Sequence, residues 1–261
     1  MTQETSKTSG WLLALDTSTP RSVLALGRVG APVDEVLLDV DEARANQASS
    51  QLTPRIEALA ERAGIALGEL EAIACGRGPG TFTGSRVAVA TTKGLALAAG
   101  CPVYGVSTLA SLASSAPAEV VGLTLAVLDA RRDEVYSAVF NRAPTRRDPS
   151  DLSRSLSWRS VEKCGPLKDV LELYIGSGDP PPWIVGPGAK AYADQIPSEV
   201  HDKVRAEVVV TPAGLWSAAV DARRNDAPVE LDSFDAVYLR VSYAEMGINT
   251  PKRPLTRSPF V

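Results

Sequence analysis

The fold of this chain is decided by residues 71–100, whose sequence is EAIACGRGPGTFTGSRVAVATTKGLALAAG. The apolar run at 72–75 predicts a buried strand, the run at 76–84 predicts a glycine loop, and 85–100 predict one helix closed by Gly100. A strand, glycine turn and helix in this order direct free backbone N–H groups and a positive helix end towards an anion. The stretch therefore predicts an α/β unit with a candidate anion site at its turn.

The glycine loop matches no standard nucleotide motif; its members are Gly76, Arg77, Gly78, Pro79, Gly80, Thr81, Phe82, Thr83 and Gly84. A Walker loop requires lysine directly after its last glycine, whereas Lys93 lies well inside the predicted helix. The dinucleotide fingerprint fails because Gly84 comes one residue too late. Two interpretations stay open: an anion site, or a tight strand-to-helix turn without a ligand.

The helix after the loop is apolar on every face, because Lys93 is its only charge between residues 87 and 99. A helix that is apolar all round must be covered all round. Ala90, Gly94 and Ala98 recur every four positions, and such short side chains let another helix approach closely. The helix is therefore either central to the core of this chain or part of a subunit interface.

Composition limits the classes of function. The 261 residues can form two domains, each with its own core, and the net charge of −4 argues against a free-standing nucleic-acid binder. Three cysteines without a C-x-x-C spacing predict neither disulfides nor a zinc site, and no apolar run reaches the roughly 20 residues of a membrane span. The only histidine, His201, lies in a polar segment, and there is no G-x-S-x-G elbow for a hydrolase. We expect a cytoplasmic protein that does not enter the membrane.

The first strand, at 11–15, ends at Asp16, and a turn beginning with Thr17 leads to a returning strand at 22–27. An acidic residue at the tip of a first strand, with hydroxyls in the turn, can hold a metal-bound nucleotide. Asp16 and Thr17 can also simply cap the hairpin through side-chain-to-backbone hydrogen bonds. Both interpretations stay open.

The second half of the chain repeats this opening, with a strand at 125–128 that ends at Asp129 and a returning strand at 134–140. Two halves that each start with a strand, an aspartate and a hairpin predict a duplicated α/β fold. A last strand is expected at 206–210. The expected domains are 11–106, completed by a helix near 212–224, and 107–210, with flexible tails at 1–10 and 247–261.

Several motifs together resemble the bacterial TsaB family, the threonylcarbamoyladenosine tRNA-modification subunits formerly called YeaZ. The motifs are LALDTST at 13–19, GRGPGTFTGSRV at 76–87, KGLA at 93–96, PVYGVSTL at 102–109, LDARRDEVY at 128–136 and YLR at 238–240. The similarity covers about residues 11–240. It implies two related domains of the actin, sugar-kinase and chaperone-ATPase type.

The resemblance also implies a non-catalytic scaffold without metal or cofactor of its own. Members of the family pair with a TsaD-like subunit that carries the metal and the active site, and a TsaE-like ATPase joins them. The complex transfers threonylcarbamoyl to the adenosine beside the anticodon of tRNA, which this chain would reach only through the complex. When the chain is alone, we expect it to associate with itself as a homodimer.

The resemblance places the partner interface on the helices at 48–63 and 85–100 and leaves a vestigial nucleotide site at Asp16, Thr17 and Asp129. The implied interface residues are Leu52, Ile56, Leu59, Val87, Ala90, Thr91, Gly94 and Ala98. One departure is Ser49-Ser50-Gln51-Leu52 in place of the usual His-Ser-Glu-Leu, which removes any polar contact made by that His and Glu.

The alternative function is a self-sufficient ATP-dependent kinase or hydrolase of the same fold class. Such an enzyme needs glycine in the first hairpin turn so that the backbone can approach phosphate, whereas this chain has Thr17-Ser18-Thr19. It also needs a carboxylate for magnesium, for which Asp16 and Asp129 are the candidates. The turn therefore favours the scaffold.

Overall fold

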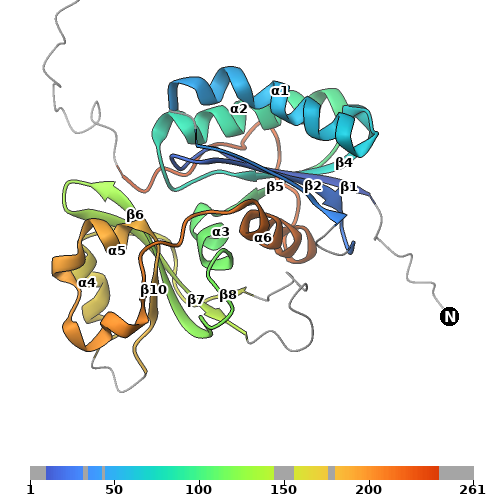
Figure 1. Ribbon diagram of the computed structural model, residues 1–261. Coiled ribbons are helices and arrows are strands. Elements are labelled where there is room, and N and C mark those ends of the chain that lie inside the picture. Colours follow the sequence, from blue (N-terminus) through green and yellow to red (C-terminus); the bar gives the residue numbers. More distant parts are fainter. Residues whose placement is uncertain (1–9, 32–34, 43–44, 144–155, 176–179, 241–261) are drawn as a thin grey trace, which may run out of the picture.

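The computed structural model describes residues 10–31, 35–42, 45–143, 156–175 and 180–240, and the side chains of these except at 45–49. The tails predicted at 1–10 and 247–261 lie outside these ranges, apart from Gly10. Two sheets lie one above the other, with helices on the outside and between them (Figure 1). None of the helices in the described ranges is long and apolar enough to cross a membrane.

The first sheet has the strand order β3-β2-β1-β4-β5. The pairs β1–β2 and β2–β3 are antiparallel, whereas β1–β4 and β4–β5 are parallel. The carboxyl ends of β1, β4 and β5 therefore meet at one edge of the sheet. The strands are β1 Trp11–Asp16, β2 Ser22–Arg28, β3 Leu37–Asp41, β4 Leu70–Gly76 and β5 Val103–Val106.

The second sheet repeats this connectivity in the order β8-β7-β6-β10-β11, with β9 pairing separately to β7. The pairs β8–β7 and β7–β6 are antiparallel, whereas β6–β10 and β10–β11 are parallel. The prediction of a duplicated α/β fold is thereby confirmed. The strands are β6 Gly122–Arg131, β7 Glu134–Arg142, β8 Leu156–Trp158, β9 Lys163–Gly165, β10 Trp183–Val185 and β11 Val204–Arg205.

The strand predicted at 206–210 is wrong, because the last strand, β11, ends at Arg205. The backbone then turns, with the N–H of Val208 donating to the carbonyl of Arg205. Val208 and Val210 are buried in a core cluster without pairing to a strand. The β-branched run at 208–210 reflects burial and not membership of the sheet.

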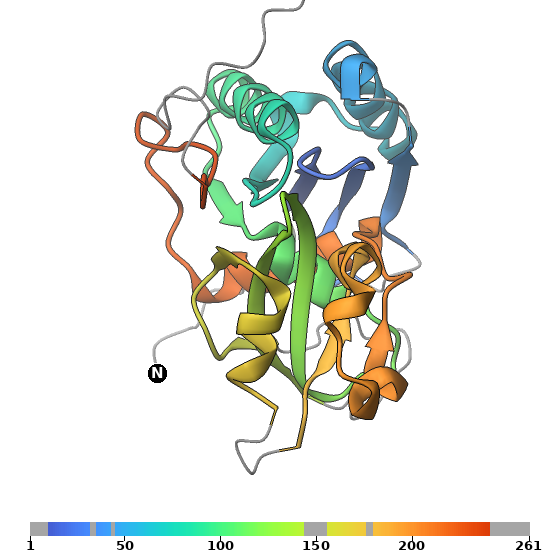
Figure 2. The same cartoon turned by 90° about the vertical axis from the view of Figure 1, so that its left-hand side faces the viewer.

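The helices are α1 Ala45–Ala63, α2 Phe82–Ala99, α3 Thr108–Ser114, α4 Leu167–Glu172, α5 Pro187–Ala191 and α6 Pro212–Asn225. The helix predicted from residue 85 begins three residues earlier, and Gly100 ends it in the left-handed conformation at φ 65°. Helices α1 and α2 cover the outer face of the first sheet, whereas α3 and α6 lie between the two sheets (Figures 1 and 2).

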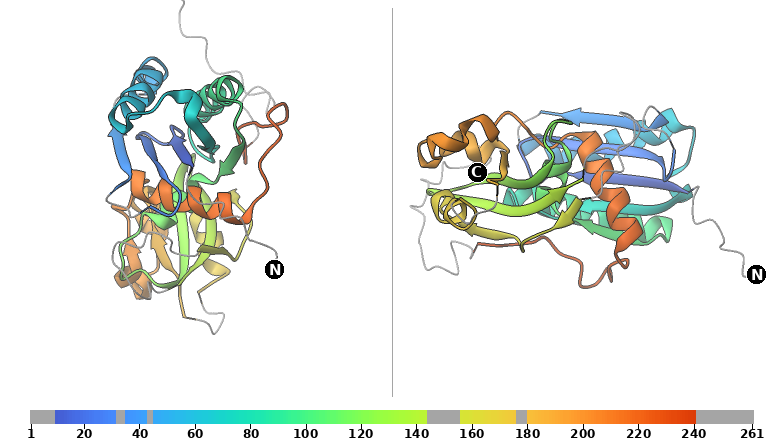
Figure 3. Two further views of the ribbon diagram at one scale, coloured as in Figure 1. Left: turned by 90° about the vertical axis from the view of Figure 1, so that its right-hand side faces the viewer. Right: turned by 90° about the horizontal axis from the view of Figure 1, so that it is seen from below.

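One apolar cluster joins the two halves, in addition to the cluster that each half has of its own. Helix α6 runs across the strands of the first sheet (Figure 3) and is buried around most of its circumference, from Gly214 to Val220. One apolar cluster joins its Leu215 to Leu12 of the first sheet and Phe140 of the second. Separate clusters lie under α1 and α2 and on the far side of the second sheet.

Candidate functional site

The glycine loop between β4 and α2 packs directly on the turn of the first hairpin. A Cβ atom at Gly80 or Gly84 would collide with the backbone oxygens of Ser18 and Thr17. The N–H of Thr81 donates to the Ser18 carbonyl at 2.6 Å, and the Thr17 hydroxyl donates to the Gly84 carbonyl at 2.6 Å. Close packing of backbone on backbone thus explains these two glycines without a ligand.

The other end of the loop is tied to β5, α3 and the last described segment. The N–H of Arg77 donates to the Val106 carbonyl at 3.0 Å, and the Gly78 carbonyl accepts from the N–H of Thr108 at 2.9 Å. The N–H of Val237 donates to the Arg77 carbonyl at 2.8 Å, and the peptide bond between Gly78 and Pro79 is cis. Through these hydrogen bonds the glycine loop connects β5, α3 and the last described segment, which gives the loop a structural role.

Asp16, at the end of β1, is 1% exposed and accepts hydrogen bonds from its own chain. Ser18 donates to it through its N–H at 2.8 Å and its hydroxyl at 2.5 Å, and the Thr108 hydroxyl donates at 2.8 Å. Burial raises the pKa of this carboxyl above its ordinary value, against the opposing effect of the hydrogen bonds. The carboxylate therefore acts as a cap of the hairpin turn, with most of its acceptor positions filled.

Asp129 takes the corresponding place in the second half and also caps its turn. It accepts from the N–H of Arg131 at 2.7 Å and from the Tyr192 hydroxyl at 2.8 Å. Burial, with Asp129 as the next cause, raises the pKa of Tyr192 to about 12. Residues 131–133 all have left-handed φ values, between 56° and 66°. Among the described residues, no group of three His, Cys, Asp or Glu side chains is placed to hold a metal ion.

The interface residues expected on α1 are buried within this chain and do not lie on its surface. Leu52, Ile56 and Leu59 are at most 1% exposed and belong to the apolar cluster beneath the helix. The exposed side of α1 is mostly polar, with Gln51, Thr53, Glu57, Glu61 and Arg62 beside Pro54 and Ala58. The apolar stripe of helix α1 thus packs on the sheet of its own chain, as in an amphipathic surface helix.

The interface residues expected on α2 are more exposed than those expected on α1. Ala90, Gly94 and Ala98 are exposed, whereas Val87 and Thr91 are half-buried. Two further exposed apolar side chains, Leu97 at 74% and Phe82 at 49%, were not predicted from the sequence. We call Phe82, Arg86, Ala90, Gly94, Leu97 and Ala98 the outer face of α2. The spacing of three and four residues in this set was the available signal, but the apolar composition all round the helix concealed it.

An aromatic cluster stands at the first turn of this face. The Nε of Arg86 donates to the Tyr238 hydroxyl at 2.9 Å, and its guanidinium carbon lies 3.8 Å from the centroid of the Phe82 ring. The rings of Phe82 and Tyr238 are 5.3 Å apart. Exposed tyrosine and arginine side chains held in place in this way are typical of the energetic centres of protein interfaces.

Gly94, in the middle of the outer face, has no structural reason to be glycine within the described chain. A Cβ atom there would meet no described atom within 4 Å, and the residue is inside a helix. Glycine at such a position costs about 1 kcal/mol of helix stability relative to alanine. A close approach by another molecule would explain it.

Comparison with known proteins agrees with this architecture. The family model described as "TsaD: tRNA N6-adenosine threonylcarbamoyltransferase" matches residues 41–151. The protein named tRNA threonylcarbamoyladenosine biosynthesis protein TsaB from Escherichia coli K12 is 36% identical over 238 residues, which cover 89% of this chain and 96% of that protein. The protein of the same name from Haemophilus influenzae is 32% identical over 189 residues, covering 70% and 74%. The solved structure of YeaZ from Pseudomonas aeruginosa matches with a TM-score of 0.70 at 30% identity, covering 88% of this chain and 100% of that one. The chain belongs to the TsaB family.

Proposed function

We propose that this chain takes part in threonylcarbamoyladenosine biosynthesis as a non-catalytic subunit that docks a TsaD-like catalytic subunit on the outer face of α2. The participation in this pathway follows the names of the relatives that match most of the chain. A TsaE-like ATPase and the tRNA would then act through the assembled complex. The observation that carries the docking surface is the outer face itself, with Leu97 at 74% exposure beside Ala90, Gly94 and Ala98.

The first hairpin supports the non-catalytic role. An enzyme that transfers phosphate needs free backbone donors and an available carboxylate near its phosphate loop. Here the N–H of Thr81 and the hydroxyl of Thr17 bond within the chain, and Asp16 accepts three hydrogen bonds. The turn of the first hairpin and the glycine loop thus pack directly against each other.

The match to the TsaD family model supports the choice of partner. The matched residues, 41–151, include both α1 and α2, so a TsaD-like partner is expected to have a similar pair of helices. Two similar surfaces can pack around an approximate two-fold axis, as in dimers of identical subunits. An interface of ordinary size would bury about 800 Å² on each side, and the short side chains of the outer face would let the helix axes come close.

A bulky charge on the outer face tests the proposal. Ala90→Arg and Ala98→Arg each place an arginine on an exposed position of α2, so the fold should remain. We expect each variant to lose binding to a TsaD-like protein by at least about tenfold, because the arginine would be buried without a partner. Binding is measured by calorimetry, and folding by thermal melting. The same variants should reduce self-association of the isolated chain, measured by light scattering.

Ala191→Arg is the matched control, because Ala191 is an exposed alanine at the end of α5 in the second half. This variant should bind as the unmodified chain does. If Ala90→Arg and Ala98→Arg both remain folded and both bind normally, the docking surface lies elsewhere and the proposal fails.

A further inference from the structure

The described chain ends in a segment that connects α2 with the second half of the molecule. Residues 226–240, which we call the strap, follow α6 and pass along β5 to the first turn of α2 (Figure 2). The N–H of Val229 donates to the Val103 carbonyl at 2.8 Å, and Phe234 and Ala236 are buried in the apolar cluster under α1 and α2. The strap is therefore held against the first half over most of its length.

The end of the strap meets the outer face of α2. The ring of Tyr238 lies 5.3 Å from that of Phe82, and its hydroxyl accepts the Nε–H of Arg86 at 2.9 Å. Tyr238 is nevertheless 43% exposed, and Phe82 is exposed to a similar extent. The exposed apolar surface of α2 thus continues onto the strap at this end of the helix.

Arg86 carries a positive charge that no acid of the described chain neutralises. Its guanidinium carbon lies 3.8 Å from the centroid of the Phe82 ring and 5.8 Å from that of Tyr238. The residue is exposed and makes no ion pair with any residue that the structure describes. A planar guanidinium held beside aromatic rings offers its remaining N–H groups to a carboxylate in a bidentate pair. An acidic side chain is therefore the partner group that fits this place.

Arg240 ties the end of the strap to the second half. Its Nη1 donates to the Ala130 carbonyl at 2.8 Å, and its Nη2 lies 3.2 Å from the carboxylate of Glu134, so both contacts are with the β6–β7 hairpin. On the other side of Tyr238, the N–H of Val237 donates to the glycine loop at 2.8 Å. Tyr238 is thus anchored on both sides before a partner arrives, which reduces the cost of ordering it on binding.

We propose that the docking surface for the TsaD-like subunit continues from α2 onto the strap, where Arg86 and Tyr238 receive an acidic side chain of the partner, and that Arg240 is a positioning residue for Tyr238. This inference rests on the docking surface proposed above and adds the chemistry of one of its contacts. The short side chains along α2 allow a close approach, and the charge at its first turn fixes the register of that approach. Through Arg240 the second half of the molecule contributes to docking by holding Tyr238 in position.

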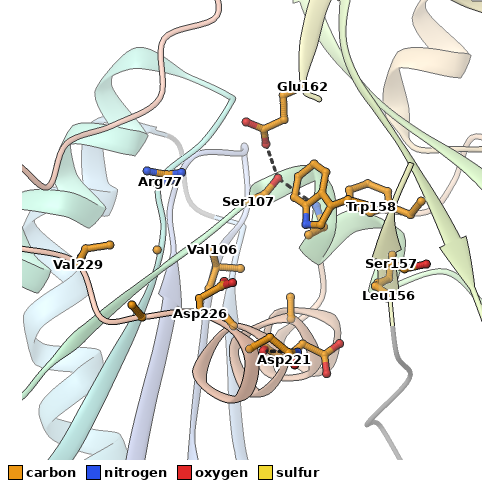
Figure 4. A pocket seen from close by; sticks show the side chains of 17 residues that line it. Arg77, Val106, Ser107, Leu156, Ser157, Trp158, Glu162, Asp221, Asp226 and Val229 are labelled. Carbon is orange, nitrogen blue, oxygen red and sulfur yellow. Dashed lines mark hydrogen bonds between the residues drawn. The ribbon is translucent and has the colours of Figure 1, made fainter. Parts of the chain in front are cut away.

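The start of the strap lines a cavity that provides a control away from α2. The cavity has a volume of about 650 Å³ and lies between the strap, α6 and β8 (Figure 4). None of its described lining residues belongs to the outer face of α2. Trp158 in this cavity is a matched control for Tyr238, because it too is an exposed aromatic side chain packed on another ring, that of Phe140 at 4.6 Å. Acidic side chains outnumber the guanidinium of Arg77 in the described lining, and they are Glu162, Asp221 and Asp226.

The first test is calorimetric titration of the full chain with a TsaD-like protein at several salt concentrations. Tyr238→Ala and Arg86→Gln should each weaken binding by about tenfold, because anchoring aromatic and arginine side chains carry most of the energy of an interface. Rising salt should weaken binding of the unmodified chain, and Arg86→Gln should reduce this salt dependence, since the variant lacks the charge. Trp158→Ala should bind as the unmodified chain does. Normal binding by Tyr238→Ala or Arg86→Gln, or an unchanged salt dependence in Arg86→Gln, would overturn the proposal.

A double-mutant cycle tests the role of Arg240. Arg240→Ala should weaken binding by about fivefold in the unmodified chain but by less than about twofold in Tyr238→Ala, because it acts through that residue. Arg240→Lys, which keeps a charge beside Glu134, should recover part of the affinity. Arg205→Ala is the control, since Arg205 also pairs with a carboxylate, that of Glu119, and donates to backbone carbonyls, but at the edge of the second sheet. Equal losses from Arg240→Ala in both backgrounds would contradict the positioning role.

Failure of this inference is distinguishable from failure of the docking surface on α2. If Ala90→Arg and Ala98→Arg abolish binding while Tyr238→Ala leaves it unchanged, α2 docks the partner and only the extension onto the strap is wrong. If Ala90→Arg and Ala98→Arg both bind normally, the docking surface itself is wrong, and this inference fails with it. Thermal melting of each variant confirms that a loss of binding does not come from unfolding.

Discussion

The two halves of this molecule have the same strand order but different helices after their glycine turns. In the first half the five residues 77–81 lead from β4 into α2, a helix of 18 residues. In the second half Gly186 leads directly into α5, a helix of 5 residues. At both places a Cβ atom would collide with the neighbouring hairpin strand or turn, at Gly80 and Gly84 in one half and at Gly186 in the other. Glycine therefore has the same packing role in both halves.

The difference between α2 and α5 underlies the proposal that α2 docks a partner. A sheet face needs a covering layer, and short elements are enough to cover the second sheet. The length of α2 leaves an outer face with Phe82 and Leu97 exposed, which the core of the chain does not require. The length of α2, more than the glycine turn, distinguishes the first half from the second.

The largest effect is expected from filling the glycine turn of the first half. Gly84→Ala should reduce the free energy of unfolding by about 3 kcal/mol, because its Cβ would overlap the Thr17 carbonyl, which the hairpin holds in place. Gly188→Ala in the second half should cost less, since the nearest atom, the carbonyl carbon of Val127, is 3.0 Å from the ideal Cβ. Urea denaturation of both variants measures the difference. Equal costs would show that Gly84 and Gly188 are packed equally tightly.

A smaller effect is expected from trimming the outer face of α2. Leu97→Ala should change the free energy of unfolding by less than about 0.5 kcal/mol, since the side chain is 74% exposed, but should weaken binding of a TsaD-like protein by about 1–2 kcal/mol. Leu173→Ala, at 58% exposure in the second half, is the matched control and should change neither quantity. Calorimetric titration and thermal melting check both variants. Loss of affinity in Leu173→Ala alone would move the docking surface to the second half.

A pH dependence is expected from the buried carboxyl of the first hairpin. Burial raises the pKa of Asp16 above the ordinary value of 3.8, so the folded state holds this proton more tightly than the unfolded state. Stability from this group therefore falls as the pH rises from about 4 through the folded pKa, by about 1.4 kcal/mol for each pKa unit of the shift. Asp16→Asn should remove this fall, as measured by urea denaturation at several pH values. A constant difference in stability between the variant and the unmodified chain from pH 4 to 7 would falsify the raised pKa.

The smallest effect is expected at Gly94, and it should have opposite signs in the two measurements. Gly94→Ala should raise the free energy of unfolding of the isolated chain by about 0.5–1 kcal/mol, because its Cβ meets no described atom within 4 Å and alanine favours helix. The same methyl group should weaken partner binding if helices approach closely there. Stabilisation without any loss of affinity would place the closest approach elsewhere on α2.

Local patterns along the chain determined the main elements of the fold. The strand, glycine loop and helix at 71–100, the two hairpins with Asp16 and Asp129 towards the ends of their first strands, and the duplication were predicted because each depends on neighbouring residues. The family was predictable for the same reason, since its motifs are contiguous. The choice between an anion site and a packed turn could not be predicted, because Ser18 and Gly80 are distant in sequence and come into contact only in the fold.

Tertiary structure decided which faces of the helices are free. Leu52, Ile56 and Leu59 form an apolar stripe that suits a partner or a sheet equally well, and only the position of α1 on the first sheet shows that they are core residues. The cavity likewise depends on Arg77, Trp158 and Asp221, which come from distant parts of the chain. The sequence by itself determined the elements and their order, since these follow from local propensity and periodicity. The exposed face of α2 and the acidic cavity required the structure, because burial and the pairing of charges depend on contacts between residues far apart in the sequence.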